Sequence, residues 1–127
     1  MVRAVLDASA ILAVLLAEPG ADATLECLGD SIISPVNVAE AVSKLMSRGM
    51  SQEAAQNAVV GLDCDIAQLD GLAGIEAGRV HHRARASGIS LGDSFCLALG
   101  RQLHLPVLTA DRAWAKLDLG IEIVLIR

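Results

Sequence analysis

Short apolar runs alternate with longer segments of helical periodicity along this chain of 127 residues. Turn-forming or charged residues bound the apolar runs, which have the length of buried strands. They predict about five strands, at residues 2–6, 31–33, 64–69, 107–109 and 122–126. The segments between them predict helices at residues 8–16, 21–28, 35–48, 51–60, 70–87, 90–103 and 112–117.

The predicted helix at 35–48 has clear boundaries and a clear apolar side. Ser34 is a favourable capping residue, Pro35 fits the first helical position, and Gly49 is a natural stop. An apolar stripe at helical spacing predicts the buried face, made of Val38, Val42, Leu45 and Met46. Four polar residues lie off this stripe: Glu40, Ser43, Lys44 and Ser47.

Strands that alternate with helices indicate an α/β fold, because parallel strands need crossover connections that cover both faces of the sheet. We therefore expect a three-layer α/β/α sandwich around a central, mostly parallel sheet. No internal repeat, linker or low-complexity tract interrupts the pattern, so residues 1–127 are expected to form one domain. Functional groups in such folds gather at the carboxyl ends of the strands.

Acidic residues occupy positions where this fold places its chemistry. Asp7 and Asp111 each follow a predicted strand, and neighbouring strands would bring both carboxylates to the same edge of the sheet. Glu40 and Asp93, near the starts of two helices, are candidates for the same pocket. A pocket of like charges favours a bound divalent cation.

Helix capping is the competing interpretation of three of these acids. Asp7 and Asp111 stand directly before predicted helices, where aspartate is a preferred cap. Asp93 lies three residues after Ser90, which is the spacing of a capping box. Each aspartate alone is explained as a cap, whereas two strand ends that both carry one favour a shared site.

Oxygen ligands without a convergent histidine or cysteine favour Mg²⁺ or Mn²⁺ over zinc. A carboxylate site of this kind suits phosphodiester hydrolysis, because the metal activates a water and neutralises the charge that develops on the phosphorus centre. The sequence therefore predicts a metal-dependent hydrolase.

Composition limits the kinds of partner that the chain can bind and the cellular compartment in which it is expected. The formal net charge of −5 argues against tight general binding to polyanions, unless the acids cluster around a metal and the bases lie elsewhere. The aromatic content of 2% leaves no platform for stacking several bases. Three cysteines without a C-x-x-C pair indicate neither a disulfide framework nor a zinc site, so a cytoplasmic location is expected. Asp7 and Glu18 interrupt the apolar start of the chain too early for a membrane span.

Four segments together resemble the PIN domain, and more narrowly the VapC-type ribonuclease toxins of bacterial toxin–antitoxin pairs. The segments are VLDASAIL, SPVNVAEAVSKL, SLGDSFCLALGRQL and PVLTADRAWAKL, and they cover nearly the whole chain in order. The resemblance implies a metal-dependent endoribonuclease that cleaves RNA, is held inactive by a cognate antitoxin and is commonly a homodimer.

The resemblance also assigns roles to individual positions. Asp7, Glu40, Asp93 and Asp111 match the metal-binding and catalytic acids of the family. Ser9 matches a small hydroxyl residue two positions after the first aspartate, where a hydroxyl orients a water or a carboxylate beside the metal. Thr109 is a second candidate for that task. Separately from the resemblance, Asn37 lies three residues before Glu40 on the same helical face, which is the placement of a partner for that carboxylate and equally that of an ordinary polar residue in the first turn.

Basic residues are candidates for contacts with RNA phosphates. Arg79 and Arg83 belong to a positively charged stretch of one helix, which is also typical of a solvated helix face. Arg112 directly follows Asp111 and has the geometry to bind a phosphate. Cys96 is expected to be a small core residue rather than a reactive thiol.

Three other functions remain open on the sequence alone. A phosphohydrolase with Asp7 as covalent nucleophile would need an acid two residues later, where the chain has Ser9. A phosphoacceptor receiver domain would need a lysine after a late strand, whereas Lys116 lies in a predicted helix. A catalytically silent binding module would have no use for four clustered acids, which are costly to keep together.

Overall fold

A computed structural model describes residues 3–127 and contains five parallel strands in the order β3-β2-β1-β4-β5. The strands are β1 (Ala4–Leu6), β2 (Ser31–Ile33), β3 (Asp65–Ile66), β4 (Val107–Thr109) and β5 (Ile123–Leu125). All neighbouring strands run in parallel, which confirms the predicted α/β fold with its central parallel sheet. Val2, at the start of the predicted first strand, lies outside the described residues.

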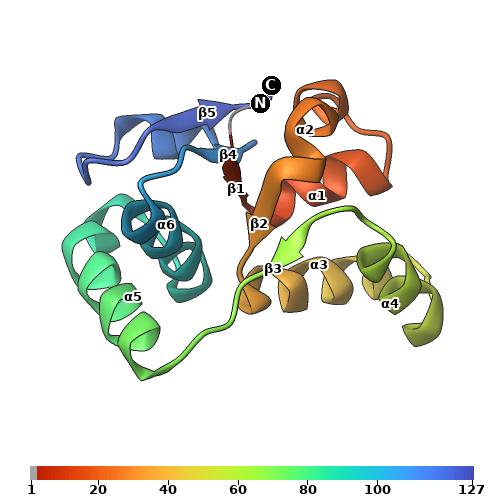
Figure 1. Cartoon of the computed structure of the whole chain (residues 1–127), viewed down its shortest axis with the longest axis horizontal. Coiled ribbons are helices and arrows are strands. Elements are labelled where there is room, and N and C mark those ends of the chain that lie inside the picture. The colour runs from red at the N-terminus through yellow and green to blue at the C-terminus, as the bar shows by residue number, and fades with distance from the viewer. Residues whose placement is uncertain (1–2) are drawn as a thin grey trace.

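Helices cover both faces of the sheet and complete the three layers (Figure 1). One face carries α1 (Ala8–Leu15), α2 (Ala21–Cys27), α3 (Pro35–Ser47) and α4 (Gln52–Val60). The other carries α5 (Gly71–Ala84) and α6 (Leu91–Leu103). Three short 3-10 helices, η1 (Leu28–Asp30), η2 (Arg85–Ser87) and η3 (Arg112–Lys116), complete the described chain. None of the helices within residues 3–127 is long and apolar enough to cross a bilayer.

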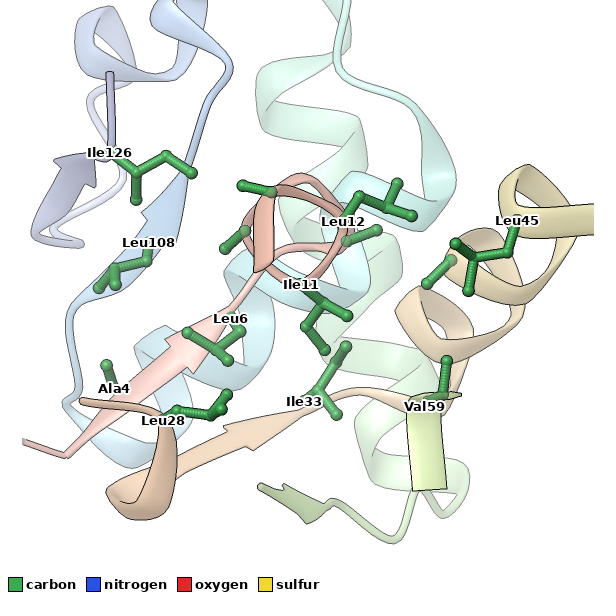
Figure 2. Close-up of a cluster of buried hydrophobic side chains, with 14 of the residues drawn as sticks. Ala4, Leu6, Ile11, Leu12, Leu28, Ile33, Leu45, Val59, Leu108 and Ile126 are labelled. Atoms are coloured by element: carbon green, nitrogen blue, oxygen red, sulfur yellow. The ribbon is translucent and has the colours of Figure 1, made fainter. Parts of the chain in front are cut away.

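Side-chain alternation along the strands supplies two separate cores. Leu6, Ile33 and Leu108 point toward the α1–α4 layer and pack with Ile11 and Leu45 (Figure 2). The residues that alternate with them, including Val5 and Val107, pack beneath α5 and α6. Strands buried on both faces explain why each reads as a continuous apolar run in the sequence.

The buried face of α3 differs from the predicted stripe. Ala41 and Leu45 are fully buried, and so is Asn37, whereas Met46 is 43% exposed. These three buried residues are spaced by four and form one row along α3, a helix that packs against α1, α4 and α6. The Ser34 side chain accepts the Val36 N–H, as expected for the predicted cap.

Several predicted boundaries also change. The predicted strand at 64–69 pairs only over β3, at an edge of the sheet beside β2. The predicted helix at 70–87 ends as an α-helix at Ala84 and continues as η2, and the helix predicted at 112–117 is the 3-10 helix η3. α1 is buried, with Ala10 and Ile11 fully inaccessible, so this apolar helix packs on the sheet.

Candidate functional site

Asp7 is the buried acid at the centre of the candidate site. It lies between β1 and α1 and is 6% exposed. Although Asp7 occupies the capping position of α1, its side chain makes no capping hydrogen bond to that helix. Its carboxylate instead accepts hydrogen bonds from two hydroxyl groups, so capping does not explain this aspartate.

The two hydroxyl groups belong to Ser9 and Thr109. Ser9 Oγ donates to Asp7 Oδ2 at 2.7 Å, and Thr109 Oγ1 donates to the same oxygen at 2.9 Å. In turn, the Ala110 N–H donates to Ser9 Oγ at 2.9 Å, and the Asp111 N–H donates to Thr109 Oγ1 at 3.0 Å. The network therefore joins the ends of the neighbouring strands β1 and β4 and fixes the Asp7 carboxylate.

Glu40 is held from two sides near the start of α3. Asn37, which is fully buried, donates from Nδ2 to Glu40 Oε1 at 3.0 Å, as predicted. On the other side, a Cβ placed on Gly92 would come within 2.7 Å of the same oxygen. The chain thus brings α6 against the Glu40 carboxylate, at a position where any larger residue would displace that carboxylate. Asn37 Oδ1 is also buried, and it accepts no hydrogen bond from the described residues.

Asp93 and Asp111 both cap helices, as their alternative interpretation predicts. Asp93 Oδ2 accepts the Ser90 N–H at 3.0 Å while Ser90 Oγ accepts the Asp93 N–H at 3.1 Å, which completes the capping box of α6. Asp111 Oδ1 accepts the Ala113 N–H at 3.0 Å at the start of η3.

Three of the four acids act electrostatically on one another. Burial raises the pKa of Asp7; hydrogen bonds from Ser9 and Thr109 lower it in part, and the charge on Asp93 raises it further. Burial also raises the pKa of Glu40, and the charges of Asp7 and Asp93 add to this effect. The sheet edge therefore brings Asp7, Glu40 and Asp93 into one negative region, with Asp111 after the neighbouring strand.

The donor set at this edge fits a hard divalent cation. The hydrogen bonds described above reach one oxygen of each carboxylate: Asp7 Oδ2, Glu40 Oε1, Asp93 Oδ2 and Asp111 Oδ1. Protein donors thus orient the acids and leave second oxygens for a ligand, as the supporting groups of metal sites do. Within residues 3–127, no three Asp, Glu, His or Cys side chains are grouped closely enough to hold an ion as they stand.

Cys96 lies in the core beneath these acids. It is fully buried, and burial together with the charges of Asp7, Asp93 and Glu40 raises the pKa of its thiol well above the ordinary value. A thiol held neutral in this way is a packing group, in agreement with the sequence interpretation.

The arginines expected to contact RNA lie on α5 and at the start of η3. Arg79 on α5 forms an ion pair with Glu76 one turn away. Arg83, also on α5, lines a hollow with Lys116 and Asp118. Arg112 is exposed at the start of η3, directly after Asp111.

A different set of cations borders the site. Lys44, Arg48 and Arg127 line a cleft that Ser9 also lines, beside the hydroxyl network of Asp7. The sequence interpretation did not select them for substrate contacts, although the spacing of Glu40, Lys44 and Arg48 by four residues was a usable signal.

Comparisons with known proteins identify the fold. The family profile of the PIN domain matches residues 4–119. A comparison with curated protein sequences found no match.

Similar solved structures come from toxin–antitoxin complexes. The DNA-bound VapBC structure from Salmonella typhimurium is 17% identical, with a TM-score of 0.79 and coverage of 100% of both chains. A toxin–antitoxin complex from Klebsiella pneumoniae is 16% identical, with a TM-score of 0.75 and coverage of 98% of both chains. VapBC2 from Rickettsia felis, bound to a promoter DNA fragment, is 14% identical, with a TM-score of 0.74 and coverage of 96% of this chain and 97% of the other.

These structural likenesses, at low identity, concern the fold, while the profile match extends over most of the sequence. It also spans the segments that contain Asp7, Glu40, Asp93 and Asp111. The chain therefore belongs to the PIN domain family.

Proposed function

We propose that this chain is a metal-dependent endoribonuclease that acts as the toxin of a toxin–antitoxin pair. One observation supports this proposal above the others: the Asp7 carboxylate is buried at a strand end and oriented by Ser9 and Thr109 instead of capping its helix. Burying an acid without a cationic partner is costly, and a bound divalent cation removes that cost.

Asp7, Glu40, Asp93 and Asp111 are the proposed ligands and catalytic acids, and Mg²⁺ or Mn²⁺ is the proposed ion. When bound, the ion lowers the pKa of a coordinated water and stabilises charge on the phosphate under attack. Asp7 and Glu40 must be ionised to bind the ion, and both have raised pKa values. Cation affinity therefore increases with pH through the range in which these two acids ionise.

The remaining residues of the site position the acids. Ser9 and Thr109 fix the rotation of the Asp7 carboxylate, and Asn37 does the same for Glu40. Carboxylates fixed in this way would hold the ion without reorganising during the reaction.

A cognate antitoxin and a second copy of the chain are the proposed protein partners. Support comes from the similar structures, which are toxin–antitoxin complexes, and from exposed apolar surface on α3. Val38, Val42 and Met46 line a broad, shallow hollow on that helix and lie outside its buried row of Asn37, Ala41 and Leu45. Apolar surface of this kind is typical of a protein interface.

The decisive experiment is cleavage of total RNA by the purified protein in Mg²⁺ or Mn²⁺, with and without EDTA. Asp7→Asn and Asp93→Asn variants are prepared in parallel, because Asn keeps the size of Asp and removes its charge. We expect EDTA and each substitution to reduce cleavage at least ~10-fold. Equal cleavage by the parent and both variants would identify a contaminating nuclease and overturn the proposal.

A further inference from the structure

A cleft of about 260 Å³ lies beside the acidic site, on the α1–α4 side of the sheet. Its walls come from α1, the turn after α1, the last turns of α3 and the end of β5. Three cations, Lys44, Arg48 and Arg127, line the cleft together with one acid, Glu18. Three of the 10 Lys and Arg residues in a chain of net charge −5 thus gather next to the proposed catalytic acids.

The cations on α3 form a row that begins at a proposed metal ligand. Glu40, Lys44 and Arg48 are spaced by four residues and so follow one side of the helix. Each step advances about 6 Å along the helix axis. Lys44 is close enough to Glu40 for its charge to lower the pKa of that carboxyl against the larger effect of burial. The row therefore leads from the acidic site into the cleft.

The third cation reaches the same place from the sheet. Arg127 follows β5, whose carboxyl end lies at the same edge as Asp7 and Asp111. Its Nη1 donates to the Pro19 carbonyl at 2.7 Å, which fixes the guanidinium at the cleft wall. A fixed guanidinium loses less conformational entropy when it binds a phosphate.

The single acid in the cleft leaves the cations available. Glu18 contacts Arg48 at 3.9 Å, and the two side chains are 30% and 64% exposed. An exposed ion pair at this distance is weak and is readily exchanged for a contact with a ligand. The side chains that line the cleft thus include three cations and one acid, in contrast to the acidic molecule as a whole.

We propose that this cleft binds the phosphodiester backbone of single-stranded RNA, with Lys44, Arg48 and Arg127 as phosphate contacts. The proposal rests on the nuclease function above and adds the path that the substrate strand takes from the catalytic acids. It also resolves the problem posed by the net charge, because the bases that bind RNA are concentrated outside the acidic site. Contacts of this kind are independent of base sequence.

The test measures RNA binding without cleavage, in an Asp7→Asn background. The probe is a fluorescein-labelled pool of single-stranded RNA of about 12 nucleotides with randomised sequence, a length that one binding groove accommodates. Fluorescence anisotropy gives the affinity between ~50 and ~200 mM salt. The variants are Lys44→Ala, Arg48→Ala and the double substitution, and Arg101→Ala is the control. The Arg101→Ala substitution also removes one positive charge, from the last turn of α6, which precedes the amino end of β4.

We expect each cleft substitution to weaken binding about 3- to 10-fold and to reduce the slope of log K against log salt by about 0.7. The double variant should approach twice that change in slope, and Arg101→Ala should have little effect. Glu18→Gln supplies a change of opposite sign, since it releases Arg48 and removes a negative charge. It should tighten binding about two- to fivefold, a gain that a general disturbance of the fold would not produce.

The proposal is overturned if Lys44→Ala and Arg48→Ala bind RNA as Arg101→Ala does, or if the Asp7→Asn protein binds no RNA. If RNA binding is unchanged in these variants, the remaining candidate for the cleft is an acidic segment of a protein. Failure here is distinct from failure of the nuclease proposal, which is judged by cleavage in the presence of Asp7. Metal-dependent cleavage with unaffected binding in the cleft variants would keep the nuclease and reject this cleft.

Discussion

Gly92 has no side chain, and this absence sets the position of Glu40, a proposed catalytic acid. Its backbone lies so close to Glu40 that a Cβ would come within 2.7 Å of Oε1. The obstructed atom is the end of a flexible side chain, so the fold tolerates a methyl group while the carboxylate moves. We expect that movement to break the hydrogen bond that Asn37 donates to Glu40.

We therefore predict that Gly92→Ala separates stability from activity. Alanine favours the helix by about 0.5–1 kcal/mol relative to glycine, so the free energy of unfolding should hold or rise. Displacement of Glu40 should weaken Mn²⁺ affinity and RNA cleavage about 10- to 100-fold. Isothermal titration with Mn²⁺ and thermal unfolding measure the two effects.

Gly74→Ala is the matched control for that substitution. Gly74 lies in α5, and a methyl group there would point into open space, because no described atom beyond the neighbouring turns of its own helix lies within 4 Å of that position. It should give the same helix stabilisation with unchanged Mn²⁺ binding. A Gly92→Ala protein with the metal affinity of the Gly74→Ala protein would show that Gly92 does not position Glu40.

At the scale of the element, two of the four proposed metal ligands also cap helices. Asp111 begins η3 by accepting the Ala113 N–H, and Asp93 completes the capping box of α6. Capping is thus a sufficient explanation of their identity, but it is no obstacle to a second role, because capping uses only one oxygen of each carboxylate.

Asparagine separates the two roles at Asp111, because Asn caps helices about as well as Asp but carries no charge. We predict that Asp111→Asn changes the free energy of unfolding by less than about 0.5 kcal/mol and lowers metal-dependent cleavage at least ~10-fold. Thermal unfolding and initial rates of RNA cleavage provide the comparison. RNA cleavage by this variant at the rate of the parent would show that Asp111 acts only as a helix cap.

Element boundaries were largely predictable, whereas the orientation of α3 was not. Ser34 and Pro35 mark its start in the sequence, and the structure begins the helix there. The apolar stripe predicts a buried Met46, but this side chain is 43% exposed, while Asn37 is fully buried. Periodicity identifies apolar residues, but a polar residue is buried when it has a partner, and here that partner, Glu40, lies on the same helix.

At the scale of the whole molecule, the buried, ionised Asp7 carboxylate opposes folding of the metal-free protein. Burial raises its pKa above the ordinary value of 3.8. The folded state then binds more protons than the unfolded state between the unfolded pKa and the raised folded pKa. The contribution of Asp7 to stability is full below the unfolded pKa and is lost as pH rises through the folded pKa.

We predict that Asp7→Asn raises the Tm of the metal-free protein at neutral pH. A gain of about 1 kcal/mol at the midpoint corresponds to roughly 3–6 °C in a domain of this size. The difference between the two proteins should shrink as pH falls below the folded pKa of Asp7. Mg²⁺ should raise the Tm of the parent and have a smaller effect on the variant, because a ligand stabilises only the state that binds it. A lower Tm for Asp7→Asn at neutral pH would contradict this account.

The sequence alone determined the α/β class, most helix and strand positions and the PIN resemblance, since periodicity, caps and the order of the acidic segments are local properties. The tertiary structure decided which acid is freed from capping, which glycine presses on Glu40 and which cations border the site. Asp7 meets Thr109 across 102 residues, and the basic cleft joins α1, α3 and the end of β5. These contacts depend on how the helices pack against the sheet and against one another. No single segment of the sequence determines that packing.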